Sequence, residues 1–214
     1  MEIVCLDMEG TLTPEIWEQV ATDFGISELN KTTRDFPSYT ELMDYRINIM
    51  KQHNLKLADI VDATKKLDLL DGALDFLDQV RQEFQVVILS DTFHEIAHPL
   101  MEKLGYPLLL CHRLNLDSEN NIIGYKLRDL KAKRQAIIGF QSMGYRCLAA
   151  GDSYNDLQMF EVADQGFFIN APESISSLMT EIPNFNNYSD LLDALRNYNL
   201  YSVSYTHLRA HETR

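Results

Sequence analysis

Three short apolar segments, far apart in the chain, each run directly into an acidic residue. They are EIVCLDM from Glu2 to Met8, QVVILSD ending at Asp91, and RCLAAGDS, which contains Asp152. Helical patterns separate them, and short apolar strands that alternate with helices predict βαβ units and a parallel sheet. Because the carboxyl ends of parallel strands point the same way, we expect these acidic residues to converge on one site.

The stretch between the first two strands is too long for a single crossover. Residues 27–70 keep a helical pattern with polar breaks and contain no convincing strand. We therefore expect a small helical cap at 15–70, inserted after the first strand, and an α/β core from 1–14 and 71–202. Further helices are expected at 16–25, 72–84, 92–105, 133–144 and 154–163, with Asp71 as an N-cap, a hairpin at 107–128 and a fourth strand at 165–171.

The chain is acidic, with a formal net charge of -13 over 214 residues. This balance argues against nucleic acid or an anionic membrane as a partner, because both select basic surfaces. No apolar run is long enough to cross a bilayer, and the start MEIVCLDMEG does not resemble a signal peptide, so we expect a cytoplasmic protein. Residues 203–214 differ from the acidic rest of the chain in their basic and histidine content, and we interpret them as a non-native tail.

The acidic residues at the strand ends predict a divalent cation. Asp7 and Asp152 would repel each other unless a cation lay between them, and hard oxygen ligands suit Mg²⁺. Such a cation would also hold a phosphate, which an acidic chain could not otherwise attract. Ser90 precedes a predicted helix start, where backbone N–H groups bind anions, and Lys133 supplies a positive charge. With Asp7 as nucleophile and Glu9 as acid and base, phosphate ester hydrolysis divides into two displacements.

These motifs, taken together, resemble those of the haloacid dehalogenase superfamily of phosphatases. The matching residues are Asp7-x-Glu9-Gly10-Thr11, Ser90-Asp91-Thr92, Lys133 and Gly151-Asp152-x-x-Asn155-Asp156. Within the superfamily the chain is similar to the phosphoserine phosphatases. Within this family the chain most resembles the subgroup that combines phosphoserine phosphatase with homoserine phosphotransferase. The segments that carry this resemblance are MEIxCLDxEG, PEIW, VVILSDTF, LLCHxL and AAGDSYND. The resemblance covers about residues 1–200.

The resemblance implies a Rossmann-like, three-layer core with a parallel sheet, and it assigns a role to each motif residue. Asp7 becomes the nucleophile and Glu9 the acid and base, with the Glu9 backbone carbonyl as a metal ligand. Asp7 and Asp152 complete the protein ligands of Mg²⁺, and Asp156 supports them from the outer shell. The residues expected to hold or border the phosphate are Ser90, Asp91, Lys133 and Asn155.

The cap is expected to recognise the rest of the substrate, O-phospho-L-serine. Phosphoserine phosphatases carry a Phe followed seven residues later by an arginine for the carboxylate, and here Tyr39 and Arg46 have that spacing. Glu15 would face the ammonium group. Two departures from the wider family, Glu9 for Asp and Ser90-Asp91-Thr92 for Ser-Gly-Gly, match the bifunctional subgroup. They leave open whether water or L-homoserine is the preferred phosphoryl acceptor.

Several alternatives remain at this stage. Arg46 also suits a surface ion pair with Glu41, Lys133 sits in a charged run, and Trp17 is most simply packing between cap and core. The enzyme could act on another small phosphate monoester, or the chain could be a non-catalytic phospholigand-binding protein. The sequence leaves the oligomeric state unsettled, with a homodimer among the options.

Overall fold

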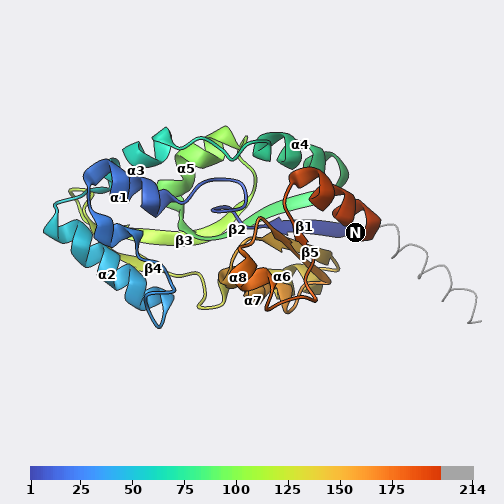
Figure 1. Ribbon diagram of the computed structural model, residues 1–214. Helices are drawn as coiled ribbons and strands as arrows, with labels where there is room; N and C mark the ends of the chain where they lie inside the picture. The colour runs from blue at the N-terminus through green and yellow to red at the C-terminus, as the bar shows by residue number, and fades with distance from the viewer. Residues whose placement is uncertain (199–214) are drawn as a thin grey trace, which may run out of the picture.

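The fold is built on one twisted sheet in the order β4-β3-β2-β1-β5-β6-β7 (Figure 1). The computed structural model describes residues 1–198, so the expected non-native tail at 203–214 lies outside the described residues. All neighbouring strands are parallel except β3 and β4, which are antiparallel. The strands are β1 Glu2–Leu6, β2 Gln85–Phe93, β3 Leu109–Leu116, β4 Ile122–Lys126, β5 Arg146–Gly151, β6 Gln165–Ile169 and β7 Asn184–Phe185.

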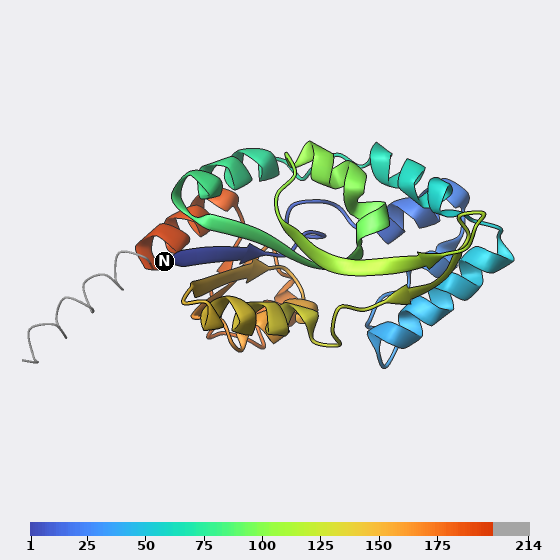
Figure 2. The same ribbon diagram turned by 180° about the vertical axis from the view of Figure 1, so that it is seen from behind.

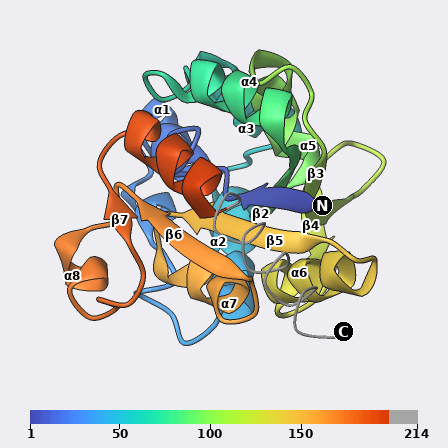
Figure 3. The ribbon, with the colours of Figure 1, turned by 90° about the vertical axis from the view of Figure 1, so that its right-hand side faces the viewer.

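Helices cover both faces of the sheet, as a doubly wound parallel sheet requires. On one side lie α4 (Ala73–Glu83), α5 (His94–Lys103) and a helix that begins at residue 188; on the other lie α6 (Ala132–Ser142) and α7 (Leu157–Phe160) (Figure 3). The alternating side chains of β1 are apolar on both faces of the sheet, so both faces need a covering layer. Val4 and Leu6 belong to one apolar core, and Ile3 and Cys5 belong to the other. The expected three-layer α/β architecture is confirmed.

Apart from α4, the helices between β1 and β2 gather at one end of the molecule, away from the N-terminus, and are called the cap below (Figures 1 and 2). They are α1 (Ile16–Phe24), a 3₁₀ turn η1 (Ser27–Asn30), α2 (Tyr39–Gln52) and α3 (Leu57–Lys66). Ser38 caps α2 by accepting a hydrogen bond from the backbone N–H of Glu41. The hairpin of β3 and β4 extends to this group, and Tyr125 of β4 donates a hydrogen bond to the Thr40 carbonyl near the start of α2. The chosen domain boundaries at 14/15 and 70/71 remain predictions.

Some local predictions were wrong. Asp71 is not the N-cap of α4; Gly72 occupies that position with a φ of 81°, a left-handed conformation that favours glycine. The strand β2 continues past Asp91 to Phe93, and α5 begins only at His94. The helix expected at 154–163 is a 3₁₀ turn at Tyr154–Asp156 followed by the four-residue α7.

Within residues 1–198, no helix is both long and apolar enough to span a membrane.

Candidate active site

The predicted site residues meet in one cavity of about 610 Å³ at the carboxyl ends of the central strands. Core and cap both contribute to its wall. Every residue with a predicted catalytic, metal, phosphate or substrate role lines this cavity except Asp156, which is fully buried. The lining includes Asp7, Glu9, Glu15, Tyr39, Arg46, Ser90, Asp91, Lys133, Asp152 and Asn155, together with Trp17. The order of strands in the sheet thus brings together motifs that are far apart in sequence.

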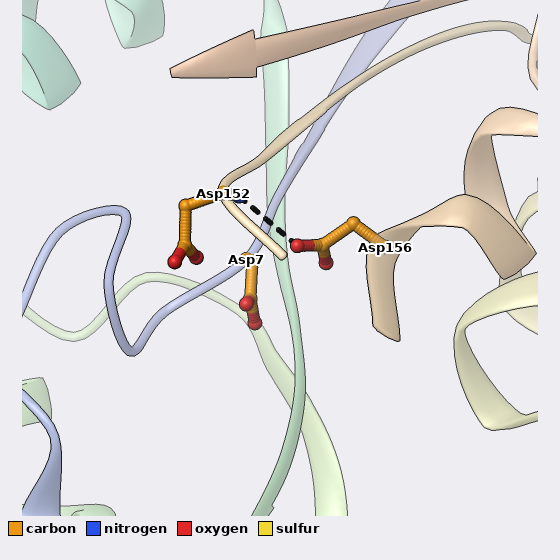
Figure 4. Close-up of side chains that lie close together, drawn as sticks. All are labelled: Asp7, Asp152 and Asp156. Atoms are coloured by element: carbon orange, nitrogen blue, oxygen red, sulfur yellow. Dashed lines mark hydrogen bonds between the residues drawn. The ribbon is translucent and has the colours of Figure 1, made fainter. Parts of the chain in front are cut away.

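Three carboxylates form the floor of the cavity. Asp7 directly follows β1, Asp152 directly follows β5, and Asp156 lies in the turn after it; their oxygens approach within 4.8 Å of one another. Figure 4 shows the Asp7 and Asp152 side chains pointing the same way, whereas Asp156 points toward the backbone of Asp152. Burial, and then the charge of Asp156, raise the pKa of Asp7 well above its ordinary value and that of Asp152 to about 7.

Asp156 already has protein partners for both of its oxygens. Its Oδ1 accepts a hydrogen bond from Lys133 Nζ at 2.8 Å, and its Oδ2 accepts from the backbone N–H groups of Asp152 and Ser153, each at 3.0 Å. The Ser153 hydroxyl adds a third bond to Oδ2 at 3.2 Å. Asp156 therefore shapes the turn that presents Asp152, and it leaves the exposed carboxylate oxygens to Asp7 and Asp152.

Lys133 lies between two of these carboxylates. Its Nζ is 2.7 Å from Asp7 Oδ1 and 2.8 Å from Asp156 Oδ1, and the residue is buried. Burial alone would lower the pKa of Lys133, but the charges of Asp156 and Asp7 outweigh burial and raise it. The alternative of a solvated charge run is therefore wrong for Lys133, which enters the site from the start of α6.

The donor set fits a hard divalent cation. Crowded carboxylates with raised pKa values resist ionising together, and a cation between Asp7 and Asp152 would relieve that repulsion. Oxygen-only ligands at a partly open position are those that Mg²⁺ prefers. The approach to Asp152 is tight, because a Cβ on Gly10 would lie 2.3 Å from Asp152 Oδ2. Gly10 also has a φ of 78°, so the turn after β1 requires glycine there.

The second acidic motif is built differently. The Ser90 hydroxyl is buried and accepts a hydrogen bond from the Thr92 backbone N–H at 3.2 Å. Burial disfavours the charge of Asp91, but His112, whose Nε2 lies 3.6 Å from Asp91 Oδ1, and Lys133 hold its pKa below the ordinary value. Asp91 is thus an ionised carboxylate, which on charge alone is a poor ligand for a phosphate.

Two glutamates, Glu9 and Glu15, line the cavity and lie close enough to affect each other's pKa. Glu9 Oε2 accepts a hydrogen bond from the Ile16 backbone N–H at 2.9 Å, at the start of α1. Burial, and then the nearby Glu15, raise the pKa of Glu9 to about 8. Burial also raises the pKa of Glu15. A carboxyl group that keeps its proton near neutral pH is suited to general acid chemistry.

The cap contributes a buried cation and a phenol. The Arg46 side chain stacks on Trp17 and donates a hydrogen bond to the Lys31 carbonyl at 2.8 Å, and it forms no ion pair with Glu41 or any other described carboxylate. The Tyr39 hydroxyl donates to the Asp91 carbonyl at 2.5 Å, which ties the cap to β2. From the sequence, Trp17 was interpreted as packing and His112 received no role, although both lie in matching segments, PEIW and LLCHxL.

Comparison with known proteins places this geometry in a family. Residues 1–164 match the haloacid dehalogenase-like hydrolase family. Phosphoserine phosphatase ThrH of Pseudomonas aeruginosa is 49% identical over 191 residues, which are 89% of this chain and 93% of that protein. A phosphoserine phosphatase of Pseudomonas syringae pv. tomato is 47% identical over 89% of this chain and 81% of its own length.

Solved structures agree on the fold. A crystal structure of phosphoserine phosphatase in apo form superposes with a TM-score of 0.74 at 20% identity, covering 91% of this chain and 98% of that one. A phospho-aspartyl intermediate analogue of phosphoserine phosphatase gives a TM-score of 0.73 at 18% identity, covering 87% and 93%. The matched residues 1–164 include all four predicted motifs. The chain belongs to the haloacid dehalogenase-like hydrolase family.

Proposed function

We propose that this enzyme is a phosphoserine phosphatase that forms an aspartyl-phosphate on Asp7. One observation carries the proposal: a single cavity holds Asp7 between Lys133 and Asp152 at its floor, and Arg46 and Glu15 toward the cap. The floor suits a phosphate and the cap side suits an amino acid. The relatives at 49% and 47% identity, both phosphoserine phosphatases by name, support the same substrate.

The first displacement moves the phosphoryl group from serine to Asp7. Lys133 holds Asp7 Oδ1 at 2.7 Å, so the other carboxylate oxygen is the one that attacks phosphorus. A bond forms between Asp7 and phosphorus while the bond from phosphorus to the serine oxygen breaks. Glu9, whose pKa is raised to about 8, donates its proton to that oxygen, and L-serine leaves as a neutral alcohol.

The second displacement regenerates the enzyme. Glu9, now ionised, takes a proton from a water molecule, and the water oxygen attacks phosphorus. The bond from phosphorus to Asp7 breaks, and inorganic phosphate leaves. If L-homoserine supplies the hydroxyl instead of water, the product is O-phosphohomoserine and the bonds balance in the same way.

Magnesium is the cofactor that the site residues fit. The carboxylates of Asp7 and Asp152 and the backbone carbonyl of Glu9 would hold it, and Asp156 would orient the Asp152 turn through its hydrogen bonds. When bound, the ion supplies positive charge to the phosphate oxygens and lowers the repulsion between carboxylates. Ser90 and Asn155 would complete the phosphate surroundings, with Asp91 contributing from its main chain.

The cap residues would select the amino acid part of the substrate. The Arg46 guanidinium suits the carboxylate, Glu15 suits the ammonium, and Tyr39 closes the wall beside Asp91. The acceptor in the cell, a homodimeric assembly and a cytoplasmic location stay predictions. A phosphatase for another small monoester remains the second candidate, since only the cap residues distinguish the two.

The direct test measures phosphate release from O-phospho-L-serine with Mg²⁺, with EDTA and with added L-homoserine. We expect release that requires the metal and that homoserine diverts into O-phosphohomoserine. Release that homoserine leaves unchanged would keep the phosphatase and reject the second acceptor. No release, with turnover of a different monoester, would reject phosphoserine as the substrate.

A further inference from the structure

The Arg46 side chain is a buried cation that is held only by neutral groups. The residue is 7% exposed, its Nη2 donates to the Lys31 carbonyl, and its Nη1 lies 3.9 Å from the sulfur of Met43. Its Nε has no hydrogen-bond partner, and burial lowers the pKa of Arg46 to about 10. Glu9 and Glu15 act on the charge of Arg46 only from beyond ion-pair distance, and burial outweighs them. A buried cation without a directly bound counter-ion favours an anion that enters the cavity.

Trp17 provides the flat surface on which this cation rests. The guanidinium carbon of Arg46 lies 4.6 Å from the centre of the Trp17 ring, well within the range of a cation–π contact. Trp17 is 7% exposed and borders the same cavity as Asp7 and Glu9. Trp17 directly follows Ile16 in α1. The backbone N–H of Ile16 donates a hydrogen bond to the Glu9 carboxyl group. One turn of α1 therefore fixes both the acid–base residue and the buried cation.

A second set of cation–π contacts stabilises the segment around Lys31, whose carbonyl is the hydrogen-bond acceptor for Arg46. The Lys31 Nζ lies 5.9 Å from the Phe36 ring and 5.7 Å from the Tyr45 ring, and the two ring centres are 5.0 Å apart. These contacts fix the segment before α2, whose Lys31 carbonyl accepts the Arg46 hydrogen bond. The guanidinium is thereby held from two sides.

The chemistry of these contacts matters for binding. A carboxylate partner would also fix Arg46 in place, but it would neutralise the charge and compete with a ligand. An indole face and a carbonyl oxygen fix the group and leave its full positive charge. A cation that is already in position loses less side-chain entropy when a ligand binds.

We infer that Trp17 is a positioning residue that holds Arg46 as the receptor for the substrate carboxylate. The inference rests on the proposed phosphoserine phosphatase function, because it assigns the carboxylate of that substrate to this end of the cavity. It replaces the interpretation of Trp17 as packing between cap and core.

The test compares two esters that differ only in the carboxylate, O-phospho-L-serine and O-phosphoethanolamine. Trp17→Leu removes the aromatic face, and Trp17→Phe keeps a smaller one. We expect Trp17→Leu to lower kcat/KM for phosphoserine about tenfold, mainly through KM, with a smaller loss in Trp17→Phe. Turnover of phosphoethanolamine should change by less than about threefold, because no carboxylate contacts Arg46 in that ester.

The outcomes separate the inference from the function on which it rests. A wild-type enzyme that treats both esters alike would refute the phosphoserine specificity, and the role of Trp17 with it. A wild-type preference for phosphoserine that both variants keep would refute the role of Trp17 alone. Equal losses on both esters would show that Trp17 only supports the fold of the cap.

A second measurement decides the matter if Trp17→Leu does not fold. Trp17 is the only tryptophan of the chain, so its fluorescence reports on the Arg46 contact. We expect L-serine, added with Mg²⁺ and inorganic phosphate, to change wild-type emission saturably, and ethanolamine to have little effect. An Arg46→Met variant should lose the L-serine response. An unchanged wild-type emission, or a response that survives in Arg46→Met, would overturn the inference.

Discussion

The aspartates of this site differ in how many of their carboxylate oxygens are already hydrogen-bonded or ion-paired to neighbouring residues. Asp156 has partners for both oxygens, whereas Asp7 keeps one oxygen free and Asp152 turns its carboxylate to the cavity. The three neighbouring aspartates thus differ in which oxygens remain available to a ligand. The aspartates were predicted from their places at strand ends, and Lys133 from its place before a helix, together with the family resemblance. The sequence could not show that Lys133 contacts both Asp7 and Asp156, because that contact depends on the packing of α6.

Lys133→Met is expected to remove turnover and lower the free energy of unfolding by about 3 kcal/mol, because it leaves two buried carboxylates without their cation. Urea unfolding without metal measures the stability. Lys131→Met, two residues earlier and exposed, is the matched control and should change stability by less than about 0.5 kcal/mol. Equal effects of the two substitutions would contradict the assigned ion pairs.

The stability of the metal-free enzyme is expected to fall as pH rises toward 8. The pKa of Asp152 is raised to about 7 and that of Glu9 to about 8, so the folded state binds more protons than the unfolded state above the ordinary carboxyl range. Stability therefore decreases with pH across this window. Thermal unfolding from pH 5 to pH 8 measures it, and Asp152→Asn should flatten the curve. A metal-free protein that became more stable over this range would be inconsistent with the crowded carboxylates.

Mg²⁺ is expected to raise the unfolding temperature, and more at pH 8 than at pH 6. Binding only to the folded state stabilises it, and the ionised carboxylates bind the cation better. The comparison uses EDTA-treated protein with and without Mg²⁺ at both pH values. An Asp152→Asn variant that kept the full Mg²⁺ response would argue against this site.

Elements of secondary structure position the site through their ends. The strands β1 and β5 stop directly before Asp7 and Asp152, and the turn after β1 bends back within a few residues. The strand cores could be predicted because they are continuous apolar runs. The N-cap at Gly72 and the short α7 could not, because a left-handed glycine and a 3₁₀ turn leave little periodic signal.

Gly10→Ala is expected to lower kcat about a hundredfold. The added Cβ meets the Asp152 carboxylate at 2.3 Å, and alanine is strained at a φ of 78°, so the Asp152 carboxylate or the turn after β1 must shift from its position. Gly139→Ala in α6, where a Cβ meets no atom within 4 Å, is the control and should keep full activity. Steady-state kinetics on phosphoserine compare the two variants. A fully active Gly10→Ala enzyme would show that this close approach is unimportant.

The whole molecule places a helical cap over one end of a doubly wound sheet. Two hydroxyl groups cross this junction, Tyr39 to the Asp91 carbonyl and Tyr125 to the Thr40 carbonyl. The sequence predicted the inserted cap from the length of its helical stretch. It could not predict how the cap meets the core, because Tyr39 and Asp91 are 52 residues apart and share no pattern.

Closure of the cap is expected to follow ligand binding. Water must be excluded from the aspartyl-phosphate, so amide exchange in residues 15–70 should slow when Mg²⁺, inorganic phosphate and L-serine are present together. Hydrogen exchange with mass spectrometry measures it, and α4 of the core serves as the internal reference. Exchange in the cap that ignored these ligands would contradict closure.

The most direct test of the mechanism traps the covalent intermediate. Wild-type enzyme and Asp7→Asn are mixed with O-phospho-L-serine that carries a radioactive phosphoryl group, quenched in acid and digested. The account predicts acid-stable, hydroxylamine-sensitive label on the peptide that contains Asp7, and none in Asp7→Asn. Turnover without any labelled wild-type protein, or label that persists in Asp7→Asn, would contradict an aspartyl-phosphate on Asp7.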